Sequence, residues 1–279
     1  MADVSYVIAG SESTGGAGIQ ADLRTFAQLG TYGVGTLTCV VSFDPKDGWG
    51  HRFVPIDGSV IADQIEAATT AHEPEVVKVG MLGTPATIDV VADALAARTW
   101  RHVVVDPVLI CKGQEPGAAL DTDNALRSRI LPLATVVTPN LFEAATLAGM
   151  DSLTTIDDLA EAAKRIADLG PRHVIVKGGV GLAGPDAVDV VFDGTEITVL
   201  SAPKVGEERV SGAGCTFAVG DHRRTDQGRR RPGRRTDRQA VHPRGHRRPA
   251  GVACAVRRGV AARLSPDRSA ARPRRSTRR

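Results

Sequence analysis

The sequence predicts an α/β fold, a mainly parallel sheet with helices on both of its faces. Short β-branched runs alternate with segments whose apolar residues recur at helical spacing, which is typical of strand–helix–strand units. The runs are short and rich in β-branched residues, as expected of strands buried on both faces. At 279 residues the chain is long enough for one such domain with a full core.

The elements follow in order along the first 220 residues. Six predicted strands are Val4–Ala9, Val34–Val41, Val76–Val79, His102–Val105, Thr135–Thr138 and His173–Val176. Helical spacing predicts helices over Ile19–Leu29, Val60–Ala71, Thr87–Ala97, Leu141–Ala148 and Asp157–Leu169. Three glycines stand where a C-terminal helix cap is expected: Gly30, Gly149 and Gly170. Finally, Ala187–Phe192 and Glu196–Leu200 flank a hairpin signal, Asp193-Gly194-Thr195, which predicts antiparallel strands at a sheet edge.

The composition changes abruptly near residue 220. Residues 221–279 hold 20 Arg, four Asp, no Lys and no Glu, a charge of +16, whereas residues 1–220 carry −13 and all ten aromatic residues. We therefore expect one domain, 1–220, and a tail, 221–279, that is disordered because it cannot supply a core.

Several classes of protein are excluded by simpler features. No run approaches the length of a membrane span, and the N-terminus lacks the pattern of a signal peptide. The four cysteines are scattered without a CxxC motif, which argues against a disulfide scaffold or a zinc site. We expect a cytoplasmic protein with reduced thiols and no membrane partner.

Polar and glycine-rich segments follow the predicted strands. In parallel sheets ligands bind outside the carboxyl ends of the strands, so these segments predict one composite site. The segments are Gly10–Gly18, Asp106–Gly113, Thr138–Glu143 and Lys177–Gly179.

Two glycine-rich loops lead into helices. Gly10–Gly18 offers backbone N–H groups to an anion, or is only a tight turn; it is not a Walker loop. Gly212–Thr216 could hold the oxyanion of a transferring phosphoryl group. There the helix dipole would lower the thiol pKa of Cys215, unless this is a buried structural cysteine. A cysteine phosphatase is excluded because Asp221 stands where it needs an arginine.

Asn140 and Glu143 lie three residues apart in the first turn of a predicted helix. Both side chains then project the same way, and their oxygens suit Mg²⁺ beside phosphates. The alternative is a capping box, in which the two residues only cap the helix.

Together these segments resemble the ribokinase-like superfamily, whose fold is a three-layer sandwich, and within it the pyridoxal kinase and hydroxymethylpyrimidine kinase branch. The resemblance runs from about Val4 to Ala218 and is greatest to bacterial pyridoxine kinases with two active-site cysteines, here Cys111 and Cys215. It rests on six motifs in order: IAGSESTGGAGIQADLRTF, VKVGML, VVVDPVLICKG, VTPNLFEAATLAG, VIVKGG and SGAGCTFA.

The resemblance implies roles for individual residues. The substrate pocket would contain Ser11, Glu12, Gly18, Phe43, His51 and Met81, although Asp is commoner where Glu12 stands. ATP would contact Asp106, Asn140, Glu143, Lys177, Gly179 and Ser211, with Mg²⁺ near Asp106 and Glu143. The catalytic anion hole would comprise Gly212, Ala213, Gly214 and Cys215, with Cys111 in the lid.

The implied reaction is ATP-dependent phosphorylation of the 5′-hydroxymethyl group of pyridoxal, pyridoxine or pyridoxamine, by a homodimer if the fold is complete. The alternative substrate is hydroxymethylpyrimidine or its phosphate on the thiamine route. Hydroxymethylpyrimidine kinases commonly use Gln where Phe43 stands, and an aromatic ring packs on a pyridine instead. We also expect Cys215 to deprotonate the alcohol, or Cys215 and Cys111 to add reversibly to the aldehyde of pyridoxal.

The tail leaves two interpretations open. It is either a basic arm that binds nucleic acid or the product of a reading-frame shift near codon 220. Because a basic arm normally mixes Lys with Arg, we favour the frameshift. A frameshift would leave the kinase domain incomplete at its C-terminus, and a protein that binds ligand without turnover is then a further alternative.

Overall fold

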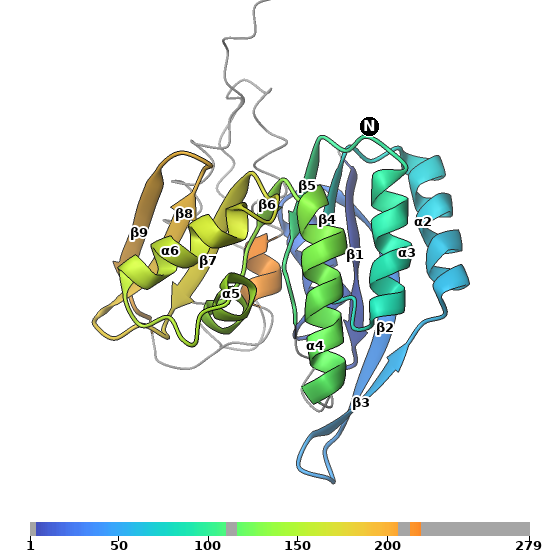
Figure 1. Ribbon diagram of the computed structural model, residues 1–279. Helices are drawn as coiled ribbons and strands as arrows, with labels where there is room; N and C mark the ends of the chain where they lie inside the picture. Colours follow the sequence, from blue (N-terminus) through green and yellow to red (C-terminus); the bar gives the residue numbers. More distant parts are fainter. Residues whose placement is uncertain (1–3, 110–115, 206–212, 219–279) are drawn as a thin grey trace, which may run out of the picture.

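The computed structural model describes residues 4–109, 116–205 and 213–218. In this part of the chain nine strands form one sheet, in the order β3-β2-β1-β4-β5-β6-β7-β8-β9 (Figure 1). The strands are β1 (Val4–Glu12), β2 (Tyr32–Asp44), β3 (Gly50–Pro55), β4 (Val76–Val79), β5 (His102–Val105), β6 (Val136–Val137), β7 (His173–Gly179), β8 (Asp186–Phe192) and β9 (Ile197–Pro203).

The predicted sheet, mainly parallel with antiparallel strands at one edge, is confirmed. The six strands from β2 to β7 along the sheet run parallel, and β8 and β9 form the antiparallel edge that the Asp193-Gly194-Thr195 signal predicts. At the other edge β3 pairs antiparallel with β2, and this strand was not predicted.

Helices cover both faces of the sheet, as expected. The helices are α1 (Gly18–Gln28), α2 (Gly58–His72), α3 (Pro85–Ala96), α4 (Pro116–Ala125), α5 (Leu141–Ala148) and α6 (Ile156–Ala167), and α4 runs on into a π-helical turn at Leu126–Ile130. The apolar residues of these helices pack against the sheet in separate clusters, one group on each of its faces. Val77, Val103 and Val105 pack in the large cluster that contains residues of α2, α3, α5 and α6.

The opposite face of the sheet carries the alternate residues of the same strands. Val7 and Ala9 pack against Ile19 and Phe26 of α1. Farther along the sheet, Val104, Val136 and Ile175 pack with Phe217 and Ala218, which end a short helical segment at 213–218. A three-layer sandwich results, and this segment and α1 lie on the same face.

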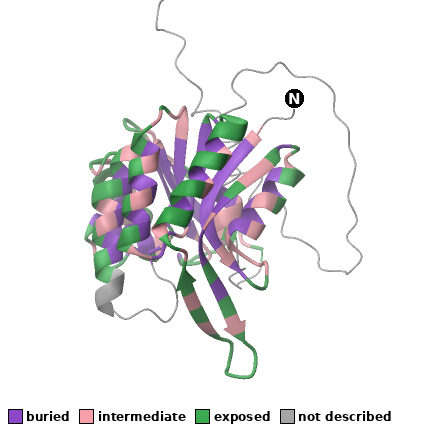
Figure 2. Cartoon of the chain, turned by 90° about the vertical axis from the view of Figure 1, so that its right-hand side faces the viewer, coloured by how far each residue is buried: buried purple, intermediate pink, exposed green. Residues whose placement is uncertain are grey.

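The end of the β2–β3 hairpin projects beyond the body of the protein. β1 stops at Glu12, opposite Val41, whereas β2 continues to Asp44. Most of the projecting residues are exposed (Figure 2). The hairpin therefore extends beyond the side of the sheet where the carboxyl ends of the parallel strands lie.

Residues 221–279 lie outside the described part of the chain, so the division into a domain and a tail stays a prediction. Within the described residues, no helix combines the length and apolar character needed to cross a bilayer.

Candidate functional site

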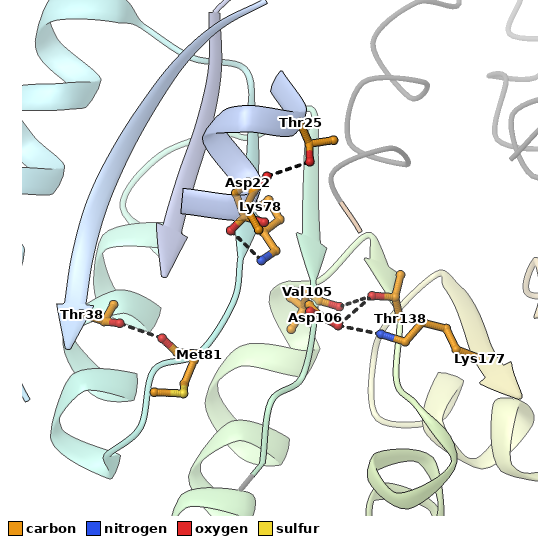
Figure 3. A network of polar contacts seen from close by, with 10 residues as sticks. Asp22, Thr25, Thr38, Lys78, Met81, Val105, Asp106, Thr138 and Lys177 are labelled. Carbon is orange, nitrogen blue, oxygen red and sulfur yellow. Dashed lines mark hydrogen bonds and ion pairs between the residues drawn. The ribbon is translucent and has the colours of Figure 1, made fainter. Parts of the chain in front are cut away.

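An ion pair lies where the central parallel strands end. Asp106 follows β5 directly, and its Oδ1 accepts a hydrogen bond from Lys177 Nζ of β7 at 2.8 Å (Figure 3). Thr138, which follows β6, donates to the same oxygen at 3.4 Å. Burial alone would raise the pKa of Asp106, but Lys177 and Lys78 lower it, so its carboxylate is charged. Two residues predicted to contact ATP are thus brought together.

The second glycine-rich loop reaches this ion pair. A Cβ at Gly214 would lie 3.2 Å from Lys177 Nζ and 3.7 Å from Asp106 Oδ2. Backbone therefore approaches both charges at the start of the helical segment, where exposed Ala213 is the first helical residue. Gly212, of the same predicted loop, and Ser211, a predicted ATP contact, lie outside the described residues, as does Cys111.

Cys215 joins the two loops. The backbone N–H of Gly18, the first residue of α1, acts on its sulfur and favours the charged thiolate. The expectation that the helix dipole lowers its thiol pKa is wrong. Burial raises the pKa of Cys215, Lys78 opposes the rise, and the carboxylates of Asp106 and Asp22 add to it. At neutral pH the thiol therefore keeps its proton.

Glu12 holds the first loop together. Its carboxylate accepts hydrogen bonds from the hydroxyl and N–H of Thr14, at 2.7 and 3.2 Å to Oε2, and from the N–H of Ala17 at 2.9 Å. Burial opposes ionisation, yet these bonds lower the pKa of Glu12. The side chain expected to contact substrate is thus engaged within its own loop. Ser11 accepts instead from Gln20 Nε2 at 2.7 Å.

Asn140 and Glu143 form the capping box that was the alternative prediction. Asn140 Oδ1 accepts from the Glu143 N–H at 3.0 Å, and Glu143 Oε2 accepts from the Asn140 N–H at 2.8 Å. Burial raises the pKa of Glu143 to about 7, with Lys177 lowering it and Asp106 raising it. Although Glu143 caps the helix, it still belongs to the site, because the charges of Asp106 and Lys177 shift its pKa.

The remaining predicted residues divide between the body and the hairpin. Met81 follows β4, its carbonyl accepts from Thr38 Oγ1 at 2.7 Å, and its methyl carbon would lie 3.4 Å from a Cβ at Gly10. Phe43 and His51 are cross-strand neighbours on the hairpin, with ring centroids 6.3 Å apart, and line a depression of ≈ 460 Å³.

The pairing of β7 with β8 is irregular after Lys177. The N–H groups of Gly178 and Gly179 both donate to the Asp189 carboxylate of β8, at 3.0 and 3.4 Å. A Cβ at Gly178 would lie 2.2 Å from the Val188 carbonyl oxygen, so a glycine is required there. Asp189 thus braces a bulge beside the lysine, and the predicted ATP contact Gly179 lies in that bulge.

The sequence analysis missed a second buried ion pair. Lys78 Nζ of β4 lies 2.9 Å from Asp22 Oδ2 of α1, and the two side chains are 1% and 0% exposed (Figure 3). Within the run Val76–Val79, Lys78 is the one residue whose side chain cannot be buried without a partner. That exception was the available signal.

Known proteins of similar sequence and structure cover the same region. The phosphomethylpyrimidine kinase family matches residues 12–220. A pyridoxine kinase of Bacillus subtilis is 44% identical over 215 residues, 77% of this chain and 79% of that protein. A hydroxymethylpyrimidine/phosphomethylpyrimidine kinase of the same organism is 36% identical over 218 residues, 77% and 78% of the two chains.

Solved structures agree with the sequence relatives. The pyridoxal kinase of Staphylococcus aureus in complex with AMP-PCP and pyridoxal is 40% identical, with a TM-score of 0.73 over 80% of this chain and 79% of that one. An ADP complex of Bacillus subtilis pyridoxal kinase is 42% identical, with a TM-score of 0.76 over 80% and 83%. With the strand-end ion pair and the glycine loops described above, these matches show that the chain belongs to the phosphomethylpyrimidine kinase family, within the ribokinase-like superfamily.

Proposed function

We propose that this protein transfers the γ-phosphoryl group of ATP to the 5′-hydroxymethyl group of pyridoxal, pyridoxine or pyridoxamine. The observation that carries the proposal is the meeting of Lys177, Asp106 and Gly214 at the strand ends, with the thiol of Cys215 in the residue that follows Gly214. The relatives named as pyridoxine and pyridoxal kinases, at 40 to 44% identity, support the choice of substrate.

The arrangement suits phosphoryl transfer, because that reaction mainly requires the two reactants to be positioned and the phosphate charge to be neutralised. It does not require a covalent enzyme nucleophile. Lys177 supplies a partly buried cation, 14% exposed, whose pKa is raised by Asp106 and Glu143 against the effect of burial. The backbone at Gly214 approaches that cation closely enough for a phosphate to contact both. Asp106 holds the ammonium group of Lys177 in position until the phosphates of ATP bind.

Cys215 contributes a neutral thiol in the resting protein, because burial raises its pKa. Lys78 and Lys177 both act on this sulfur and would stabilise a thiolate once the site fills. Deprotonation of the alcohol and reversible addition to the aldehyde of pyridoxal both require that thiolate. Cys111 is the second thiol for the addition.

The residues present fit a magnesium ion held mainly through water and phosphate. Asp106 raises the pKa of Glu143, so these carboxylates are close enough to repel each other. Among the described residues no cluster of three or more His, Cys, Asp or Glu could enclose a metal. One or two carboxylates completed by substrate phosphates is the usual Mg²⁺ arrangement. Asp106 and Glu143 would hold the ion, which would supply neutralising charge to the phosphates.

Phosphorylation of hydroxymethylpyrimidine is the second candidate, supported by the relative that is 36% identical. Phe43 favours the pyridine substrates, because its ring offers a packing surface and no hydrogen bond to a pyrimidine edge. The homodimer, the cytoplasmic location and the nucleic-acid and turnover-deficient alternatives stay predictions from the sequence.

Substrate choice is tested by assaying pyridoxine and hydroxymethylpyrimidine side by side with the 279-residue chain. We expect a higher kcat/KM for pyridoxine. The Phe43→Gln variant should lower the ratio of kcat/KM for pyridoxine to kcat/KM for hydroxymethylpyrimidine. The control is Phe53→Gln, on the paired strand β3, which should leave that ratio unchanged. A preference for hydroxymethylpyrimidine in the unsubstituted chain would favour the second candidate.

A further inference from the structure

The amide of Gln20 bridges the end of β1 and the first turn of α1. The backbone N–H of Glu12 donates to Gln20 Oε1 at 3.3 Å, and Gln20 Nε2 donates to Ser11 Oγ at 2.7 Å. One side chain thus contacts two consecutive residues of the loop that leads to Gly18.

These two contacts fix the direction of each hydrogen bond. A backbone N–H can only donate, so the amide atom that faces Glu12 is the oxygen. The nitrogen is then turned toward Ser11, and because an amide nitrogen only donates, the Ser11 hydroxyl accepts. The hydroxyl proton of Ser11 is consequently directed away from Gln20.

Ser11 lies beside the groups that meet at the reaction centre. It follows Gly10, whose carbonyl oxygen would be 2.4 Å from a Cβ at Gly18, so the two ends of the loop are in close contact. The N–H of Gly18 in turn acts on the sulfur of Cys215 and lowers its pKa. Ser11 is only partly buried, whereas the Glu12 carboxylate is engaged by Thr14 and Ala17. Of the two side chains that end β1, Ser11 is therefore better placed than Glu12 to contact the alcohol substrate.

We propose that Gln20 is a positioning residue that presents Ser11 as a hydrogen-bond donor to a lone-pair acceptor on the alcohol substrate. The inference rests on the proposed function, since it assumes that an acceptor-bearing heterocycle such as pyridoxine binds beside the loop. It predicts that the affinity for pyridoxine depends on the orientation of the Gln20 amide, and not merely on the bulk of the side chain.

The test compares three variants of the full chain by calorimetric titration with pyridoxine, which requires no turnover. In Gln20→Glu both carboxylate oxygens accept, so Ser11 must donate to the introduced carboxylate and can no longer donate to the ligand; we expect about tenfold weaker pyridoxine binding. Ser11→Ala removes the donor directly and should weaken binding about as much. The double variant should be no weaker than either single variant, because both changes remove one interaction.

Two further measurements separate positioning from general damage. Gln20→Met leaves the Ser11 hydroxyl free to rotate and still donate, so we expect only about a twofold to threefold loss. ADP affinity should change less than twofold in every variant. Gln28→Glu, the same substitution at an exposed position of α1, is the matched control and should bind pyridoxine normally.

Additive losses in the double variant, or equal losses in Gln20→Glu and Gln20→Met, would overturn the role of Gln20 while leaving the proposed function intact. Failure of the unsubstituted chain to bind pyridoxine would overturn both.

Discussion

Replacing Lys78 by methionine should be among the most damaging single substitutions in the sheet. Methionine keeps the length and apolar stem of lysine but removes the ammonium group. Asp22 would then be a carboxylate that is 0% exposed, and its Oδ1 already has no hydrogen-bond partner. Removing one member of a buried ion pair typically costs about 3–5 kcal/mol.

The structure allows this magnitude to be checked. Without Lys78 the folded protein can avoid a buried charge by protonating Asp22, whose ordinary pKa is 3.8. At pH 7 that protonation costs about 4 kcal/mol, at roughly 1.4 kcal/mol for each pH unit. A folded pKa raised above the unfolded value makes stability fall as pH rises above the unfolded value. The cost in Lys78→Met should therefore fall below about 2 kcal/mol at pH 5.

Urea unfolding at pH 5 and pH 7 measures this cost. Asp22→Asn in the Lys78→Met background removes the charge and should restore most of the stability at pH 7. The control is Arg165→Met, which breaks an ion pair with Glu161 whose side chains are about half exposed, and should cost at most about 0.5 kcal/mol. A Lys78→Met cost below about 1 kcal/mol, equal at both pH values, would refute the reasoning.

Three other predictions follow from the described contacts. Asn140→Ala removes the acceptor for the Glu143 N–H and should lower the free energy of unfolding by about 1 kcal/mol; no change in the urea midpoint would contradict this. Burial lowers the pKa of His173 to about 4, so stability should rise with pH between about 4 and 6.5, by roughly 2 kcal/mol after allowance for solvent screening. His173→Asn should flatten that dependence in unfolding curves taken across the window. Lys177→Met should weaken ADP binding by at least about tenfold in calorimetry, because the cation beside Gly214 is lost, whereas Lys164→Met, at an exposed position of α6, should bind normally.

The central elements could be predicted from sequence because local pattern and burial agree there. β4, β5 and α5 begin and end at the predicted residues. Each of these strands is a short run of valines with one polar residue, and α5 has an N-terminal capping box and a glycine at its C-terminal end. Where the local sequence pattern and the burial of the segment agree, the bounds of an element can be predicted without knowledge of its tertiary contacts.

The projecting hairpin shows why other elements could not be predicted. β3 contains Arg52 and mostly exposed residues, so it lacks the apolar run used to find strands. It is stabilised by pairing with β2, a contact between segments that no local pattern contains. The same pairing extends β2 beyond its predicted end at Val41.

The sequence predicted which segments contribute to the candidate site better than it predicted the charges and pKa shifts within the site. The segments that follow the strands predicted one composite site, and two residues from those segments, Asp106 and Lys177, form an ion pair. The thiol pKa of Cys215 was predicted in the wrong direction, because a local helix start does not reveal how deeply the packed sheet buries the sulfur. Lys78 and Asp22 are 56 residues apart, so their pairing emerges only in the folded protein.

The most direct test of the account is to incubate the full 279-residue chain with ATP, Mg²⁺ and pyridoxine and to identify the product by mass spectrometry. The account predicts pyridoxine 5′-phosphate formed with one ADP per product, and its loss in Lys177→Met. ATP hydrolysis without a phosphorylated alcohol, or product formation that survives Lys177→Met unchanged, would contradict the central claim that these strand ends form a phosphotransfer site.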